Sequence, residues 1–347
     1  MVIFKILVIV KMQSLQKIIL YLHSLYISLI PYSKLSDTIV SVETKHIKTK
    51  STGGLNMFRT KSSLIITLLL MIGLLAACGS DIQETENKSD GYSGLVNAAG
   101  STALLPLADE AASAFMDKHV NVSVTVQGGG SGTGINQVAS GAVNIGNSDL
   151  PSADKIEDKV LAKELIDHKV AGIAYGIIVN DDAGVDNLTV AQIQGIFSGK
   201  IKNWREVGGS DLEINVVNRP GSSGTRYAFQ KTIMKNERIS DSIGTNQDSN
   251  GAVEKAIQST PGSVSYLAMS YLREANDSSL KTVRINEAEP TAENVANGSY
   301  PFWSYEYMVT KGEATGVVKG YLEFIKSEEF AEVVTKLGYI PMFMLEK

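Results

Sequence analysis

The chain of 347 residues contains one cysteine and four histidines. A single cysteine, Cys78, excludes an intramolecular disulfide, and no Cys/His cluster has the spacing of a metal site. Only His119 and His168 follow Cys78, and neither lies beside a motif at a strand end. The sequence also lacks the Gly-x-Ser-x-Gly turn of serine hydrolases and the Gly-x4-Gly-Lys-Ser/Thr loop of nucleotide hydrolases. We therefore expect no catalysis, no metal and no cofactor.

The segment before Cys78 has the features of an export signal. Residues 57–61 carry two positive charges, residues 62–75 are mainly apolar, and small residues precede the cysteine. Leu75-Ala76-Ala77-Cys78 resembles the lipobox of bacterial lipoproteins, in which the cysteine is lipidated and becomes the mature N-terminus. We expect residues 57–77 to be a lipoprotein signal peptide and Cys78 to anchor the protein to the extracytoplasmic face of the cell membrane. The alternative is a transmembrane anchor, for which the apolar run is short.

Two further N-terminal segments are expected to lie outside the fold. Residues 1–56 fit no part of the export signal, which predicts that translation starts at Met57 and that this segment is an over-extended reading frame. Residues 78–91 are polar and poor in apolar side chains, which is typical of a flexible tether between a lipid and a domain.

The charge balance of the remaining chain limits its partners. Of the 32 Lys and Arg residues nine precede Cys78, and of the 37 Asp and Glu residues two do, so the part from Cys78 onward carries 23 basic and 35 acidic residues, a net charge of −12. So acidic a surface argues against nucleic acid or anionic lipid as a partner. An anionic ligand would need local dipoles and one or two cations.

Strand and helix patterns alternate from residue 95 onward, which is typical of α/β layers with largely parallel sheets. The run 170–179 is long and apolar, and we expect it to cross between two lobes. The predicted strands are 95–99, 122–126, 143–146, 214–217 and 263–267. The predicted helices are 104–115, 135–142, 155–167, 190–197, 225–234, 252–259 and 316–337.

Three segments rich in glycine and hydroxyl residues follow strands and precede helices. They are residues 100–102, 128–134 and 219–225, and an aspartate ends the related segment Asn147-Ser148-Asp149. Backbone N–H groups and hydroxyls at a helix N-terminus favour negative charge. In open α/β sheets such loops lie at the carboxyl ends of strands, where ligands bind. The pattern predicts a small oxyanion held by hydrogen bonds.

The order of these motifs resembles the phosphate-binding lipoproteins (PstS family) of phosphate ABC importers. The resemblance spans residue 92 to the C-terminus, and it rests on the segments 99–102, 128–134, 145–149, 196–204 and 219–225, with 300–302 and 338–341. It implies a type II periplasmic-binding-protein fold with a ligand cleft between two lobes. Lobe 1 is expected at 92–173 and 268–347, and lobe 2 at 174–267.

The resemblance also implies the function and the site. The protein would capture inorganic phosphate and deliver it to the permease and ATPase subunits of an ABC importer. The expected phosphate-binding residues are Ser101, Thr102, Ser131, Asp149, Arg219, Ser223, Gly224 and Thr225, and whether Ser101 or Thr102 supplies the hydroxyl stays open. Two departures, Ala103 and Pro220-Gly221-Ser222, bear on fine selectivity rather than on the core site.

Asp149 is the residue that separates phosphate from sulfate. Phosphate keeps at least one proton near neutral pH, and a buried carboxylate can accept it, whereas sulfate would face an unpaired charge. Each site residue also has a structural alternative: Asp149 as a cap of the helix after Pro151, Arg219 in a surface salt bridge, and Ser131 and Ser223 as turn residues.

Other functions stay open from the sequence. A binding protein for another oxyanion such as sulfate shares nearly all of these features, and a surface adhesion or signalling protein could use the same fold. Phe197 and Trp204 are expected in the core of lobe 2 rather than against the ligand, whereas Lys200 and Lys202 are expected on a solvated surface.

Overall fold

The computed structural model describes residues 91–272 and 279–346, all within one compact unit. The predictions for the reading frame 1–56, the signal peptide 57–77 and Cys78 lie outside these residues, as does the tether except for residue 91. In the described ranges no helix combines the length and the apolar character needed to cross a membrane.

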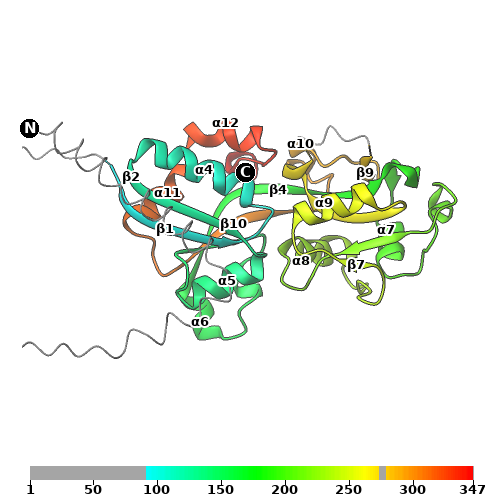
Figure 1. The fold of residues 1–347 in the computed structure, drawn as a ribbon, viewed down its shortest axis with the longest axis horizontal. Coiled ribbons are helices and arrows are strands. Elements are labelled where there is room, and N and C mark those ends of the chain that lie inside the picture. Colours follow the sequence, from blue (N-terminus) through cyan, green and yellow to red (C-terminus); the bar gives the residue numbers. More distant parts are fainter. Residues whose placement is uncertain (1–90, 273–278, 347) are drawn as a thin grey trace, which may run out of the picture. The chain divides into compact units, whose positions relative to one another are not determined.

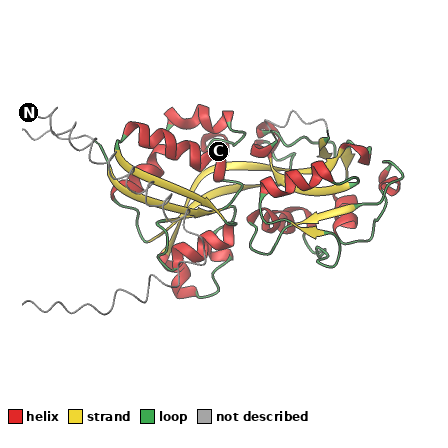
Figure 2. Ribbon diagram, viewed as in Figure 1, coloured by secondary structure: helices red, strands yellow, loops and turns green. Residues whose placement is uncertain are grey.

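Strands and helices alternate along the described chain (Figures 1 and 2). The strands are β1 (Ser93–Gly100), β2 (Asn121–Gly128), β3 (Ile145–Ser148), β4 (Leu165–Asn180), β5 (Asn187–Leu188), β6 (Asn215–Asn218), β7 (Thr245–Asn246), β8 (Ser263–Ala268), β9 (Leu280–Ile285) and β10 (Trp303–Lys311). The α-helices are α4 (Leu105–Lys118), α5 (Ser131–Ala139), α6 (Lys159–Glu164), α7 (Val190–Phe197), α8 (Gly224–Phe229), α9 (Asn250–Ser259), α10 (Ala292–Ala296), α11 (Gly316–Ile325) and α12 (Glu328–Lys336).

The long strand β4 joins two groups of strands, as expected for the apolar run 170–179. Its first part pairs with β10, from Leu165 to Ala174, and its second part pairs with β8, from Tyr175 to Val179. The strand order is β2-β1-β3-β10-β4-β8-β6-β7, and β9 pairs with β4 and β5. This arrangement, with helices on both sides of the strands, is the α/β two-lobe fold that the sequence predicts.

The sheet is more mixed than the alternation of elements predicted. The pairs of β1 with β2 and β3, and of β6 with β7 and β8, are parallel. By contrast, β10 pairs antiparallel with β3 and β4, and β4 pairs antiparallel with β8 and β9. The sequence analysis missed β10 because five consecutive residues, Glu306 to Thr310, are buried in it, so no alternation of apolar and polar residues marks the strand.

Helices of the first group of strands cover both faces of the sheet. In Figure 1, α4 and α11 lie over one face of β1 and β2, and α5 lies on the other, in agreement with their residue contacts. The predicted apolar face of α4 is buried through Leu107, Ala111 and Phe115, and the alternation in β2 buries Val122 and Val124. Phe197 and Trp204 are buried in the core, as predicted.

Two helix predictions need correction. The helix expected at 155–167 is reduced to α6, because Asp158 caps it by accepting from the N–H groups of Val160 and Leu161 and because Leu165 already pairs with Lys311 as a strand. The C-terminal helix expected at 316–337 is divided into α11 and α12, since the Ser327 side chain caps a new helix start.

The lobe boundaries stay a prediction. The strand β9 belongs to the range 268–347 expected in lobe 1, yet it pairs with the Ile177–Asn180 end of β4 and with β5. These partners lie in the range 174–267 expected in lobe 2.

Candidate functional site

The strand register brings the ends of β1, β2 and β3 to one level of the sheet. Gly100 pairs with Gly128 on one side and with Asn147 on the other. Both glycine loops therefore leave the sheet beside the segment that ends in Asp149. The N–H of Gly130 donates to the carbonyl of Gly100 over 2.8 Å, which ties the first two loops together.

The third loop joins this group although it comes from β6. The N–H of Gly132 donates to the carbonyl of Ser222 over 3.0 Å. A Cβ on Gly224 would lie 2.1 Å from the Ser131 hydroxyl oxygen and 2.7 Å from the Asp149 carboxyl carbon. Only glycine permits so close an approach, because the neighbouring atoms belong to a buried side-chain network.

Asp149 lies at the centre of this network and is 3% exposed. Its carboxyl oxygens accept hydrogen bonds of 3.1 Å from the hydroxyls of Ser131 and Thr225. Its own N–H donates to the Ser131 hydroxyl over 3.0 Å. The short helix after Pro151 has no side-chain cap, so Asp149 does not cap it.

The proton affinity of Asp149 follows from its burial. Burial raises the pKa of its carboxyl above the ordinary value of 3.8, and this effect outweighs the hydroxyl hydrogen bonds and the charge of Arg219, which lower the pKa. A ligand that donates a proton to this carboxylate would therefore stabilise its charged form.

Arg219 is buried as well, at 1% exposure, which rules out the surface salt bridge. Its Nε and Nη2 donate to the backbone carbonyls of Gln247 and Asp248 over 3.0 and 3.2 Å. Its Nη1 has no hydrogen-bond partner among the described residues. Each Nη carries two protons, so Nη1 and the second proton of Nη2 remain for an acceptor, and the guanidinium is held in place by the backbone.

The first loop contributes two buried hydroxyls with different partners. The Ser101 hydroxyl accepts from the N–H groups of Ala103 and Leu104. The Thr102 hydroxyl accepts from the side-chain amide of Asn250 over 2.9 Å and from its backbone N–H over 3.3 Å. The Thr102 hydroxyl keeps its own proton for donation, whereas the Ser101 hydroxyl bonds to the Asp149 carboxyl and, against the larger effect of burial, lowers its pKa. Thr102 lines a cavity of about 410 Å³ that also includes Ser222, whereas Ser101 is not part of its lining.

Ser223 has a structural role in addition to its place in the third loop. Its hydroxyl accepts from the N–H of Arg226 over 3.2 Å, which caps the start of α8. The side chain of Arg226 in turn donates to the carbonyl of Arg219 over 2.6 Å and pairs with Asp241. These contacts fix the loop that carries Arg219.

The structure therefore brings together all the residues predicted for the site. The predicted set is Ser101, Thr102, Ser131, Asp149, Arg219, Ser223, Gly224 and Thr225, and the seven non-glycine side chains are buried. Direct contacts link Asp149 with Ser101, Ser131, Gly224 and Thr225.

Sequence reasoning missed Asn250, Tyr175 and Glu306. Asn250 begins α9, and its side-chain amide donates to the Thr102 hydroxyl. Tyr175 bonds to Ser304 over 2.6 Å, and burial raises the pKa of Tyr175, which the charge of the nearby Asp149 raises further. Glu306 is fully buried in β10. The signal that could have found it is a lone glutamate in an aromatic, strand-forming run, Trp303 to Tyr307.

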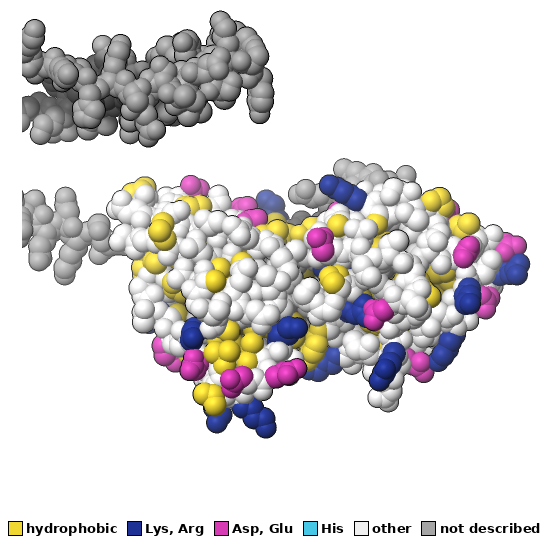
Figure 3. All heavy atoms as spheres, turned by 60° about the horizontal axis from the view of Figure 1, so that its bottom comes forward, with side chains coloured by type: hydrophobic (Ala, Val, Ile, Leu, Met, Phe, Trp, Pro, Cys, Tyr) yellow, Lys and Arg dark blue, Asp and Glu magenta, His cyan; other side chains and the backbone are white. Residues whose placement is uncertain are grey.

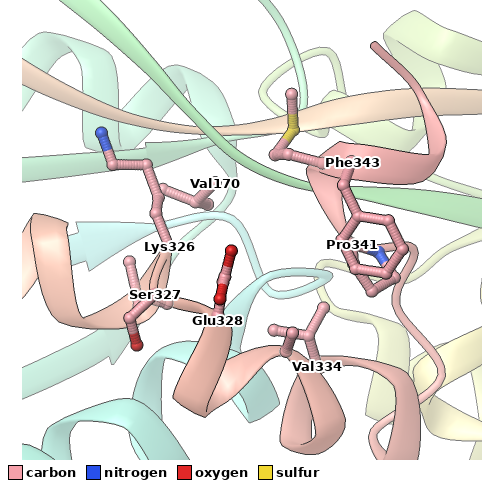
Figure 4. Close-up of a pocket in the computed structure, with 10 residues that line it drawn as sticks. Val170, Lys326, Ser327, Glu328, Val334, Pro341 and Phe343 are labelled. Atoms are coloured by element: carbon pink, nitrogen blue, oxygen red, sulfur yellow. The ribbon is translucent and has the colours of Figure 1, made fainter. Parts of the chain in front are cut away.

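Asp149 itself lines a second cavity, of about 310 Å³, with Pro151, Tyr227 and Lys231, and the remaining cavities of the described residues lack such a set of converging groups. One of about 350 Å³ lies at the start of α12 and is shown in Figure 4, where Lys326, Ser327 and Glu328 face Pro341 and Phe343 across it. Charged side chains of both signs are scattered over the face in Figure 3, so that face presents no basic patch for anions. The three loops remain the best anion site.

Comparison with known proteins agrees with this geometry. The family described as PBP superfamily domain matches residues 82–329. The phosphate-binding protein PstS of Bacillus subtilis (strain 168) is 42% identical over 291 residues, which cover 81% of this chain and 95% of that protein. The PstS of Borreliella burgdorferi is 27% identical over 291 residues, covering 81% of this chain and 98% of that protein.

Two solved structures are similar in fold and sequence. One is a putative phosphate ABC transporter substrate-binding protein with bound phosphate from Clostridium perfringens, with a TM-score of 0.65 and 32% identity, covering 72% of this chain and 99% of that chain. The other is an ABC-type phosphate transport receptor from Vibrio cholerae, with a TM-score of 0.57 and 27% identity, covering 71% and 99%. The family resemblance predicted from the motifs is thus confirmed, and the chain belongs to the PBP superfamily and, within it, to the PstS family of phosphate-binding proteins.

Proposed function

We propose that this protein captures inorganic phosphate outside the cytoplasm and delivers it to the permease and ATPase subunits of an ABC importer. The relatives support this function, because the Bacillus subtilis protein is named for phosphate binding and the Clostridium perfringens structure contains phosphate. Binding without chemical conversion also fits a site made of hydroxyls, one arginine and one carboxylate.

The observation that carries the proposal is the buried pair of opposite groups, Asp149 and Arg219. Arg219 offers guanidinium protons to anionic oxygens, and Asp149 accepts a proton. Monoprotonated phosphate satisfies both, since it is at once an anion and a hydrogen-bond donor. Sulfate carries no proton near neutral pH, so the anion would lie against the negative charge of Asp149 with no hydrogen bond between them.

The remaining site residues act as donors in this proposal. Thr102 and Ser131 donate from the loops after β1 and β2, and Ser223, Gly224 and Thr225 donate from the loop after β6. Between Ser101 and Thr102, we favour Thr102 as the ligand donor, because the Ser101 hydroxyl already bonds to Asp149 and accepts from the backbone of its own loop.

We further propose that Cys78 carries the lipid that holds the protein at the outer face of the membrane. Its support is the lipobox-like Leu75-Ala76-Ala77-Cys78 behind a basic and apolar segment. We also propose residues 78–91 as the tether, and lobe boundaries at 173/174 and 267/268. The pairing of β9 with the end of β4 is the observation that tests the boundary at 267/268.

The decisive experiment is isothermal titration calorimetry of the purified mature protein with phosphate and, separately, with sulfate. We expect one phosphate per chain and no measurable heat from sulfate at the same concentration. Comparable binding of both anions would assign the site to oxyanions in general, and binding of neither would contradict the proposal.

A further inference from the structure

Glu306 is a buried acid in contact with the proposed phosphate site. In the antiparallel pairing of β10 and β3, the last paired residues are Tyr307 and Ser148, and Glu306 and Asp149 are the residues immediately beyond them. Glu306 is 0% exposed, and neither of its carboxyl oxygens has a hydrogen-bond donor among the described residues. A buried carboxylate without donors is costly, and the usual outcome is that the group keeps its proton.

The groups around Glu306 come from three elements. Asp149 faces it from the end of β3, and its charge and the proximity of its carboxyl raise the pKa of Glu306, after burial as the main cause. Tyr175 in β4 and Tyr339 after α12 lie close enough that the charge of Glu306 would raise their pKa. Two carboxylates are both acceptors and cannot bond to each other, so a bond between Asp149 and Glu306 requires one proton.

We propose that Glu306 is a positioning residue of the phosphate site, which stays protonated and donates its proton in a hydrogen bond to Asp149, so that the two carboxyls together hold one negative charge. This inference rests on the proposed function. Asp149 then remains a carboxylate that can accept the proton of phosphate. Besides Glu306, the hydroxyl groups of Ser101, Ser131, Tyr175 and Thr225 bond to it.

The charge balance of the site supports this role. Arg219 supplies one buried positive charge, and it matches one negative charge on the pair. If Glu306 were ionised as well, the anion would meet two carboxylates and one cation, which disfavours binding. A neutral Glu306 therefore keeps the site open to an anion and also keeps Asp149 charged.

The first test uses the ligand-free mature protein, so it does not depend on phosphate binding. Infrared spectroscopy near neutral pH should show the carbonyl stretch of a protonated carboxylic acid in the wild type and in the control Glu332→Gln, an exposed position in α12. The band should be lost in Glu306→Gln. A wild-type protein without this band, or a Glu306→Gln protein that keeps it at full intensity, would overturn the inference.

The second test measures phosphate affinity against pH in Glu306→Leu and Glu306→Gln. Leucine removes the donor, so Asp149 should take up a proton at a higher pH than in the wild type. The acidic limit, the pH below which phosphate affinity falls, should therefore rise by about one to two pH units, the range expected for loss of a hydrogen bond to a charged group. Glutamine keeps a donor and should move the limit less.

A shift of the acidic limit in the opposite direction would show that Glu306 is ionised in the wild type. If Glu306 were ionised in the wild type, both substitutions would remove a negative charge, strengthen phosphate binding and lower the acidic limit. That result, or an unchanged limit in both variants, would overturn the inference. If Glu306→Leu does not fold, Glu306→Gln and the infrared band decide alone. A wild-type protein that binds no phosphate contradicts the proposed function, whereas the infrared result still tests Glu306.

Discussion

The hydroxyl of Thr225 donates to the carboxyl of Asp149 over 3.1 Å, across 76 positions of the chain. Thr225 belongs to the loop after β6, and Asp149 follows β3, so this bond connects loops of the two groups of strands. The same carboxyl that would accept the phosphate proton therefore also holds these loops together. A ligand that bonds to Asp149 and to the third loop would favour the arrangement in which they meet.

Replacing Asp149 by asparagine should narrow the gap between phosphate and sulfate. The substitution removes the charge that accepts the phosphate proton and repels sulfate, and a hydrogen bond to a charged group accounts for about 10-fold to 100-fold in affinity. Calorimetry with both anions measures the ratio. Asp117→Asn, at an exposed position in α4, serves as the control and should leave the ratio unchanged. An unchanged ratio in Asp149→Asn would contradict its role in selectivity.

Replacing Arg219 by alanine should weaken phosphate binding by roughly 30-fold to several thousand-fold. Truncating one partner of a buried hydrogen-bonded charge pair costs about 2–5 kcal/mol, and about 1.4 kcal/mol corresponds to a factor of ten. Arg219→Lys should give an intermediate affinity, because it restores the charge but not the planar fork.

The matched control is Arg205→Ala, which removes an exposed arginine paired with Asp211. It should bind phosphate like the wild type. If Arg219→Ala folds normally and also binds like the wild type, the third loop is not part of the ligand site.

Replacing Gly224 by alanine should weaken phosphate binding by about 5-fold to 150-fold. The added Cβ would lie 2.1 Å from the Ser131 hydroxyl oxygen, so Ser131 or the third loop must shift, and overpacking of this kind costs about 1–3 kcal/mol. Gly221→Ala is the control in the same loop, since a Cβ there meets nothing within 4 Å. Equal affinity of the two variants would show that the close approach at Gly224 does not matter for binding.

Processing of the N-terminus is tested by mass spectrometry of protein extracted from membranes. We expect a mature N-terminus at Cys78 that carries lipid, and no peptides from residues 1–56. A Cys78→Ser variant should be released from the membrane or remain unprocessed. Peptides from residues 1–56 in the mature protein would contradict the assignment of the reading frame.

The sequence allowed prediction of the fold class and of the residues that gather at the site, because these depend on local patterns. Glycine and hydroxyl residues after strands are visible in the sequence, and parallel strands bring their ends to one edge. The prediction of a helix over 155–167 was wrong, because the pairing of Leu165 with Lys311 overrides the local preference for helix.

The partners of the site residues could not be predicted in the same way. Asn250 lies 148 positions from Thr102, and Glu306 lies near Asp149 just beyond the antiparallel pairing of β10 with β3. Such contacts depend on tertiary register, which a single sequence does not reveal. The burial of Glu306 also needs the packed structure, because an isolated glutamate in a strand is usually exposed.

Replacing Glu306 by glutamine should make the protein relatively more stable as the pH rises. Burial raises the pKa of Glu306 in the native state well above its ordinary value of 4.5. Between pH 4.5 and the native pKa, the native chain therefore binds a proton that the unfolded chain has lost. The stability contribution of the protonated group is therefore complete below pH 4.5 and decreases as the pH rises toward the native pKa, with a slope of up to about 1.4 kcal/mol per pH unit.

Urea unfolding at about pH 5, 6, 7 and 8 measures this dependence. Glutamine does not titrate, so the difference in the free energy of unfolding between Glu306→Gln and the wild type should change in favour of the variant at each step. Asp149 also has a raised pKa and acts in the same direction, so Asp149→Asn is compared in parallel. A difference that stays constant with pH would mean that Glu306 binds no extra proton in the native state, and its place beside Asp149 would then need another explanation.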